Sequence, residues 1–125
     1  MAVGSNLKVV SIDDDRIQHI LVKKRMQMVD PTIETISFDE PQNALEWLAE
    51  NKAHLILMDL NFPELSGWEL LLEIQKITET PLVILTGNIS PFELQKKEEY
   101  PQVIRLLEKP ISASHIEEII SQIVT

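Results

Sequence analysis

Three acidic residues and one lysine of this sequence follow short apolar segments at three separate places along the chain. Apolar runs of this length are typical of strands buried in a parallel sheet. The carboxyl ends of parallel strands meet at one edge of the sheet, where open α/β folds bind ligands, so the four charges are expected to form a cluster there. The residues are Asp13 and Asp14 after Leu7–Ile12, Asp59 after Leu55–Met58, and Lys109 after Val103–Leu107.

Three carboxylates at such short range repel one another. At an effective dielectric constant near 20, two like charges ~4 Å apart cost roughly 4 kcal/mol, whereas a whole domain is stable by only ~5–15 kcal/mol. The cluster is therefore expected to hold a proton or to bind a cation. Mg²⁺ suits oxygen ligands and also recruits phosphate oxygens, and Lys109 adds a second positive charge for a phosphoryl oxygen.

A fourth apolar segment, Leu82–Leu85, ends in Thr86 and Gly87. The Thr86 hydroxyl is a hydrogen-bond donor at the same edge, although threonine is also common in strands for conformational reasons alone. Gly87 leaves room for a bulky group. A carboxylate nucleophile, a metal site, a lysine and a hydroxyl together favour phosphoryl transfer onto Asp59.

The spacing of the apolar segments predicts the elements that position these residues. Helical patterns separate the segments, and each parallel strand needs a crossover helix. We therefore expect a (βα)5 fold, an α/β doubly wound five-stranded parallel sheet with helices on both faces. The predicted strands end near Ile12, Phe38, Asp59, Thr86 and Leu107.

Helix start signals fall between these strands. Asp15 is expected to cap a first helix over about Arg16–Met28. Its apolar face is predicted to comprise Ile17, Ile20, Leu21 and Met28, interrupted by Lys24. Three further pairs resemble capping boxes: Asp39 with Gln42, Ser90 with Glu93, and Ser114 with Glu117. The last helix is predicted to bury the stripe of Ile116, Ile119, Ile120 and Ile123.

Length and composition limit the possible functions. A chain of 125 residues suits one domain, 1–125. The absence of cysteine excludes a disulfide, a thiol nucleophile and a zinc–thiolate site, and the three histidines are too scattered to predict a histidine metal site. A net charge of −9 argues against binding nucleic acid or anionic membrane. The chain has neither a signal-like start nor an apolar run long enough to span a membrane, so a cytoplasmic location is expected.

Four motifs in this order resemble the receiver domain of bacterial two-component response regulators, the CheY-like family. The resemblance runs from Lys8 to Ile123 and implies the strand order 2-1-3-4-5. It implies a signalling switch that phosphorylates and dephosphorylates itself and has no small-molecule turnover as its purpose. The motifs are Ile12–Asp15, Met58–Pro63 with Gly67, Leu85–Gly87, and Glu108–Pro110.

The resemblance also implies roles for individual residues. Asp59 matches the phosphoacceptor, which takes its phosphoryl group from a phosphohistidine on a histidine kinase or a histidine phosphotransfer protein. Lys109 and Thr86 match the residues that contact the phosphoryl group after transfer. The implied Mg²⁺ ligands are Asp14, Asp59 and the backbone carbonyl of Asn61, with Asp13 acting through metal-bound water.

Two positions depart from the family pattern. Leu106 stands where receivers often carry an aromatic ring that moves during switching, and Tyr100–Gln102 replaces a common Gly-Ala pair. The conformational change that transmits phosphorylation is therefore either a shift of Leu106 or a different rearrangement. Lys109-Pro110 matches a site where the family has a cis peptide bond.

Other functions compete with a phosphorylated switch. An aspartate-dependent Mg²⁺ phosphatase would use a second Asp two residues after its nucleophile as general acid, whereas this chain has Asn61 there. A flavodoxin-like nucleotide binder needs a phosphate cradle after the first strand, where Asp13–Asp15 would repel phosphate. A receiver-fold protein-binding module without phosphorylation is the remaining alternative.

The sequence says less about assembly and partners. Because the chain ends directly after the fifth helix, we expect a stand-alone receiver. Its downstream target is an unknown protein, and pairing of two copies through the fourth and fifth helices is an expectation by analogy. Trp68 follows Gly67 and is expected to lie beside the loop after Asp59.

Overall fold

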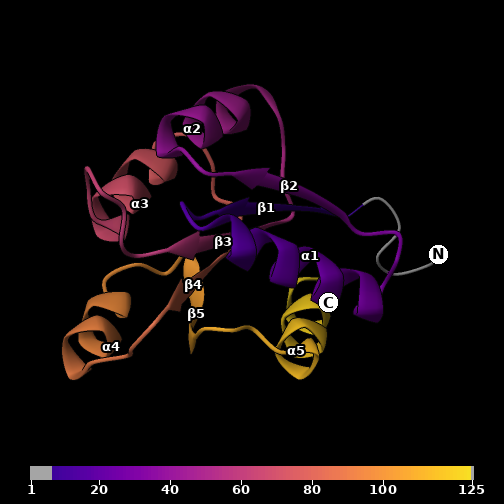
Figure 1. The fold of residues 1–125 in the computed structure, drawn as a ribbon. Helices are drawn as coiled ribbons and strands as arrows, with labels where there is room; N and C mark the ends of the chain where they lie inside the picture. The colour runs from indigo at the N-terminus through magenta and orange to yellow at the C-terminus, as the bar shows by residue number, and fades with distance from the viewer. Residues whose placement is uncertain (1–6, 125) are drawn as a thin grey trace.

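A computed structural model describes residues 7–124, and within them strands and helices alternate strictly along the chain (Figure 1). Residues 1–6 and 125 of the predicted domain lie outside the described part. The strands are β1 (Lys8–Ile12), β2 (Glu34–Phe38), β3 (Leu55–Asp59), β4 (Leu82–Thr86) and β5 (Val103–Glu108). The helices are α1 (Arg16–Val29), α2 (Pro41–Glu50), α3 (Gly67–Gln75), α4 (Pro91–Lys97) and α5 (Ala113–Val124).

The strands form one parallel sheet in the order β2-β1-β3-β4-β5, which confirms the predicted fold class and strand order. Four of the five predicted strand ends are also confirmed. β5 ends at Glu108, one residue later than predicted, because Glu108 still pairs with Thr86 of β4. The register pairs Ile12 with Met58, so the ends of β1 and β3 lie side by side.

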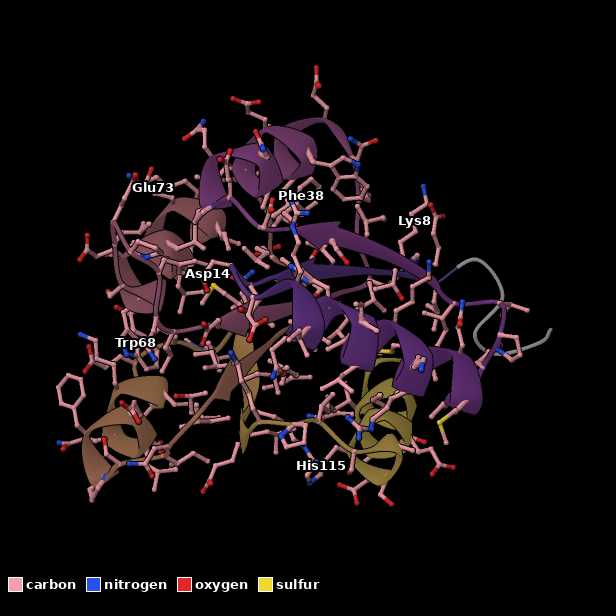
Figure 2. The ribbon with its side chains drawn as sticks, viewed as in Figure 1. Lys8, Asp14, Phe38, Trp68, Glu73 and His115 are labelled. Atoms are coloured by element: carbon pink, nitrogen blue, oxygen red, sulfur yellow. The ribbon has the colours of Figure 1, made fainter. Side chains whose placement is uncertain are left out.

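Helices cover both faces of the sheet. α1 and α5 pack on one face and contact each other, while α2 and α3 pack on the opposite face and α4 contacts β5 (Figure 1). β3 and β4 are buried along their whole length, as central strands covered on both faces must be. Figure 2 shows Asp14 beyond the end of β1 and His115 on α5, well apart from it.

The predicted inner face of α1 is wrong. Ile17, Ile20 and Met28 are exposed, with 65%, 58% and 74% of their surface accessible. The helix instead packs against the sheet and α5 through His19, Val22 and Met26. The prediction counted apolar residues only, so it missed that a histidine with buried hydrogen-bond partners belongs to the inner face.

Two helix starts agree with the sequence. The Asp15 side chain caps α1 by accepting a hydrogen bond from the backbone N–H of Ile17 at 2.9 Å. Ser90 and Glu93 form a capping box at α4, in which the Glu93 carboxylate accepts from the Ser90 backbone N–H at 2.9 Å. The predicted apolar stripe of α5 is also confirmed, because Ile116, Ile119 and Ile120 are buried.

Two other predicted caps are wrong. The residue preceding α2 is Glu40, and the carboxylate of Asp39 pairs with Arg16 at 3.4 Å instead. α5 begins at Ala113, one residue before the predicted cap Ser114, because the Ser112 hydroxyl already accepts a hydrogen bond from the backbone N–H of His115 at 3.1 Å.

Candidate metal centre

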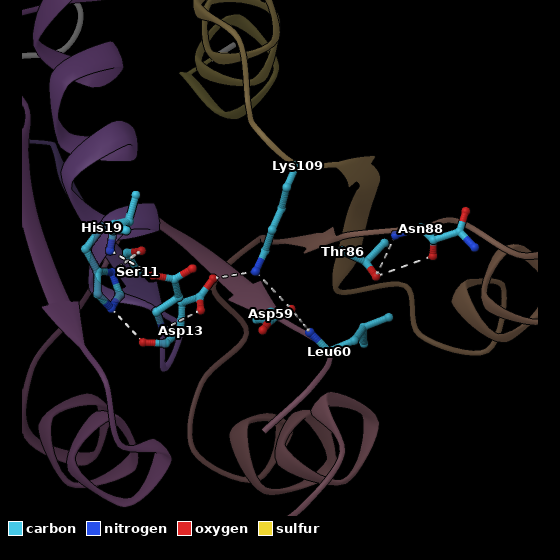
Figure 3. A network of polar contacts seen from close by, with 10 residues as sticks. Ser11, Asp13, His19, Asp59, Leu60, Thr86, Asn88 and Lys109 are labelled. Carbon is cyan, nitrogen blue, oxygen red and sulfur yellow. Dashed lines mark hydrogen bonds and ion pairs between the residues drawn. The ribbon is translucent and has the colours of Figure 1, made fainter. Parts of the chain in front are cut away.

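Three carboxylates gather at the carboxyl edge of the sheet, and Figure 3 shows two of them, Asp13 and Asp59. Asp13 follows β1 and Asp59 ends β3, and these strands are direct neighbours. Asp13, Asp14 and Asp59 each offer one oxygen atom within 4.8 Å of the others. Asp13 and Asp59 are buried, and Asp14 is exposed. The structure therefore brings together the acids that the sequence proposed as a cluster.

The Lys109 ammonium lies between two of these acids. Its Nζ is 2.8 Å from Asp13 Oδ2 and 3.4 Å from Asp59 Oδ1 (Figure 3). Burial disfavours the charged ammonium, but hydrogen bonds and ion pairs with the two carboxylates outweigh this cost and raise the pKa of Lys109. The lysine is therefore charged at neutral pH, and the peptide bond that follows it, Lys109-Pro110, is cis as the family pattern implies.

The Asp59 carboxylate is held at an energetic cost. Burial and the neighbouring charge of Asp13 raise its pKa, against the opposing effects of Lys109 and of the backbone N–H groups of Asn61 and Leu60. The Leu60 N–H donates to Asp59 Oδ1 at 2.8 Å. When all three acids are ionised, one ammonium leaves the cluster with net negative charge, which a divalent cation would neutralise.

This cost leads to a stability prediction for protein without divalent cations. Because the folded-state pKa of Asp59 is raised, its ionised form destabilises the fold above that pKa, and the penalty disappears as pH falls through it. Asp59→Asn should therefore stabilise the cation-free protein at neutral pH. Urea unfolding of both proteins should show this difference shrinking as the pH is lowered; a constant or growing difference would contradict it.

The chemistry of the donor set fits Mg²⁺, which prefers carboxylate oxygens and retains several waters. Lys109 competes for the same oxygens, since it pairs with Asp13 and Asp59. Lys109→Met should therefore bind Mg²⁺ about tenfold more tightly, equivalent to ~1.4 kcal/mol. Isothermal titration calorimetry measures the effect, and Lys76→Met, which removes an exposed lysine paired with Glu73, is the control. Weaker Mg²⁺ binding by Lys109→Met would contradict the expected competition.

Thr86 ends β4 at the same edge, but its hydroxyl does not face the carboxylates. It donates to the backbone oxygen of Asn88 at 3.4 Å and accepts from the Asn88 N–H at 3.5 Å (Figure 3). The Thr86 backbone oxygen accepts from the Lys109 N–H at 2.8 Å. The backbone of Thr86 is thus fixed beside Lys109, while its hydroxyl closes a local turn.

The loop after β3 carries Asn61, which is exposed and bridges to Ser66. Gly67 closes this loop, since its N–H donates to the Leu60 oxygen at 2.6 Å. A Cβ atom at Gly67 would lie 2.6 Å from both the Asp59 backbone oxygen and the Leu60 Cα. The close approach requires glycine and ties the start of α3 to the residue that ends β3.

A groove opens beside Asp14. It has a volume of about 540 Å³, and its lining includes no basic side chain. It lies over α2, the loop after β3 and α3, and residues that line it include Asp14, Asp39, Leu45, Phe62, Glu64 and Leu65. The exposed carboxylate of Asp14 is thus reachable from outside through a surface that attracts cations.

Leu106 and Tyr100, at the two places where the chain departs from the family pattern, lie in the core. Leu106 is buried among the apolar residues between the sheet, α2 and α3. Trp68, at the start of α3, stacks on Tyr100 with ring centroids 5.6 Å apart and an interplanar angle of 24°. The Trp68 ring therefore connects the end of the loop after Asp59 to the segment that precedes β5.

Sequence reasoning missed two residues near the cluster, Ser11 and His19. Both are buried. The His19 ring contacts the Ser11 hydroxyl and the backbone oxygen of Asp13 (Figure 3). One signal could have found them: Ser11 is the one polar residue inside an otherwise apolar strand end, and His19 stands one turn into the helix that follows.

Comparisons with known proteins agree on one family. The sequence profile of the response regulator receiver domain matches residues 9–121. The chain is 29% identical over 87 residues, or 69% of its length, to the autoinducer 1 sensor kinase/phosphatase LuxN of Vibrio campbellii. The chain is 30% identical over 84 residues, or 67% of its length, to the transcriptional regulatory protein SrrA of Staphylococcus aureus. These stretches make up 10% of LuxN and 34% of SrrA, so the chain spans only a minor part of either.

Solved structures share the fold at low sequence identity. A two-component response regulator from Cytophaga hutchinsonii superposes with a TM-score of 0.87 at 22% identity, covering 96% of this chain and 98% of the other. The chemotaxis response regulator CheY4 of Vibrio cholerae superposes with a TM-score of 0.77 at 22% identity, covering 95% and 99%. Within residues 7–124, no helix is both long and apolar enough to cross a membrane.

Proposed function

The chain belongs to the response regulator receiver domain family, and on this basis we propose that it is a phosphoacceptor switch of a two-component signal transduction system. Asp59 would receive a phosphoryl group from a phosphohistidine on a histidine kinase or a histidine phosphotransfer protein. The observation that carries the proposal is the meeting of Asp13, Asp14 and Asp59 with the Lys109 ammonium at one strand edge.

In this proposal the chain's own residues bind Mg²⁺, orient the phosphoryl group and receive it. Asp14, Asp59 and the backbone carbonyl of Asn61 would hold Mg²⁺, with Asp13 acting through its bound water. Bound Mg²⁺ would supply positive charge to the phosphoryl oxygens. A carboxylate oxygen of Asp59 attacks phosphorus, and the bond from phosphorus to the histidine nitrogen breaks, with the electron pair leaving on that nitrogen.

Lys109 and Thr86 would act on the product of this transfer. The ammonium is already paired with Asp59 Oδ1, and it would move its hydrogen bond to a phosphoryl oxygen as the acyl phosphate forms. The Thr86 hydroxyl would have to leave Asn88 and turn toward the phosphoryl group.

The proposal extends to the whole domain and its partners. Residues 1–125 would form one receiver domain that acts in the cytoplasm and binds neither nucleic acid nor membrane directly. Phosphorylation would change the affinity for an unidentified protein target, and two copies of the domain would pair through α4 and α5. The similarity to stretches of LuxN and SrrA supports a kinase as the phosphoryl source. The domain would hydrolyse its own acyl phosphate without turning over small molecules.

The test is an intact-mass measurement after incubation with acetyl phosphate and Mg²⁺. We expect one added phosphoryl group, lost at alkaline pH and absent when EDTA removes the metal. Unchanged mass across donors, including phosphoramidate, would favour a protein-binding module without phosphorylation. Sustained release of phosphate from many esters would favour an aspartate-dependent phosphatase.

A further inference from the structure

We propose that His19 is a positioning residue for the metal centre, which holds the backbone of Asp13 so that the Asp13 carboxylate faces Lys109 and the cation. The inference rests on the proposed function, since it concerns the same site. His19 lies one turn into α1 and is only 9% exposed. It contacts no carboxylate oxygen of the cluster in the described contacts, so it acts through Asp13.

The hydrogen bonds of His19 fix its tautomer. Its Nε2 lies 2.7 Å from the Asp13 backbone oxygen, which can only accept, so Nε2 carries the proton. In the neutral ring Nδ1 is then an acceptor, and the Ser11 hydroxyl donates to it at 3.0 Å. The Asp13 carbonyl thus selects the ring form, and the Ser11 hydroxyl, which can donate or accept, satisfies the other ring nitrogen (Figure 3).

His19 completes the anchoring of Asp13. The Asp13 N–H donates to the Phe38 oxygen of β2 at 3.1 Å. Its Oδ1 accepts from the Asp15 N–H at 2.9 Å, and its Oδ2 pairs with Lys109 at 2.8 Å. The backbone oxygen of Asp13 accepts a hydrogen bond from His19 Nε2. All four polar atoms of Asp13 therefore have partners, and only one of those partners is supplied by a helix side chain.

The other buried residues of this helix face show why a histidine here is informative. Val22 and Met26 pack on the sheet through apolar contacts alone. An imidazole at the same depth is costly unless it is hydrogen-bonded, and an apolar residue would leave the Asp13 carbonyl unpaired. Groups that orient a metal ligand in this way typically change metal affinity by ~10–100-fold when they are removed.

The first measurement uses the unaltered protein without metal. In ¹⁵N-labelled protein at neutral pH, we expect the His19 ring as the Nε2–H tautomer, with a proton that exchanges slowly with water. The Nδ1–H tautomer, or rapid exchange of the ring proton, would overturn the inference, because His19 would then not donate to Asp13.

The second measurement compares two amides of different reach. A glutamine side chain places its N–H about as far from the backbone as Nε2 of histidine, and an asparagine side chain reaches only the Nδ1 position. His19→Asn should therefore weaken Mg²⁺ binding by about tenfold, while His19→Gln should stay within about twofold of the unaltered protein. Equal affinities for the two variants, whether both high or both low, would overturn the inference.

A matched control and a check on folding complete the design. His115 lies on α5, away from Asp14, and His115→Asn should leave Mg²⁺ affinity unchanged (Figure 2). Circular dichroism shows which variants fold, and if His19→Asn does not, the tautomer measurement decides alone. Failure of the unaltered protein to bind Mg²⁺ or accept a phosphoryl group would overturn the proposed function. Normal binding with no difference between the two amides would overturn only the role of His19.

Discussion

Asp59→Asn is expected to take up no detectable phosphoryl group from acetyl phosphate and Mg²⁺, under conditions that modify the unaltered protein fully. The substitution keeps the shape of the side chain. In the unaltered protein the Leu60 N–H donates to the Asp59 carboxylate at 2.8 Å, and the amide oxygen of asparagine can still accept this hydrogen bond. The substitution removes the negative charge and the nucleophilic oxygen, without which the acyl phosphate cannot form. Intact mass over a time course measures the loss.

Asp15→Asn is the matched control for this experiment. Asp15 is two residues from Asp13, but its carboxylate caps α1, and asparagine caps helices about as well as aspartate. The control should be phosphorylated at the rate of the unaltered protein. A phosphoryl adduct on Asp59→Asn at an equal rate would place the acceptor elsewhere and end the assignment of Asp59.

Gly67→Ala should lower the stability of the domain strongly. The added Cβ would lie 2.6 Å from the Asp59 backbone oxygen and the Leu60 Cα, which are main-chain atoms that cannot rotate away. Inserting a methyl group into such a contact costs about 3 kcal/mol. The loop that carries Asn61 must also shift, so Mg²⁺ binding should weaken. Urea unfolding measures the stability change.

Gly87→Ala provides the comparison, because a Cβ at Gly87 would meet no atom within 4 Å. Its stability should stay within about 0.5 kcal/mol of the unaltered protein. If both glycine substitutions were equally harmless, the Gly67 contact would not hold the loop. If both were equally damaging, the effect would reflect loss of glycine in general and not the contact.

Much of the fold and the clustering of charges could be predicted from the sequence, for one physical reason. Parallel strands buried on both faces need continuous apolar runs, and β3 and β4 have them. Once those runs are recognised, their carboxyl ends must meet at one edge. Asp13 and Asp59 meet because β1 also lies beside β3, a strand order that the family resemblance implied and the apolar runs alone did not fix.

Features that depend on side-chain partners could not be predicted in this way. The inner face of α1 follows His19, whose burial depends on hydrogen bonds to Ser11 and Asp13 that no hydrophobic periodicity reveals. The Asp39 carboxylate pairs with Arg16 instead of capping α2. The Thr86 hydroxyl turns to Asn88. In each case a polar partner that is near in space, and not always near in sequence, decides where the side chain goes.

The hydrogen bond between the Lys109 N–H and the Thr86 oxygen constrains how this molecule could respond to modification. This hydrogen bond joins the main chain at the carboxyl ends of β4 and β5, so the Cα atoms of Thr86 and Lys109 stay close together while it persists. While it persists, the response of Thr86 and Lys109 to modification would begin with rotation of their side chains. A spin label or fluorophore between β4 and α4 is expected to report the loss of the hydrogen bonds between the Thr86 hydroxyl and Asn88.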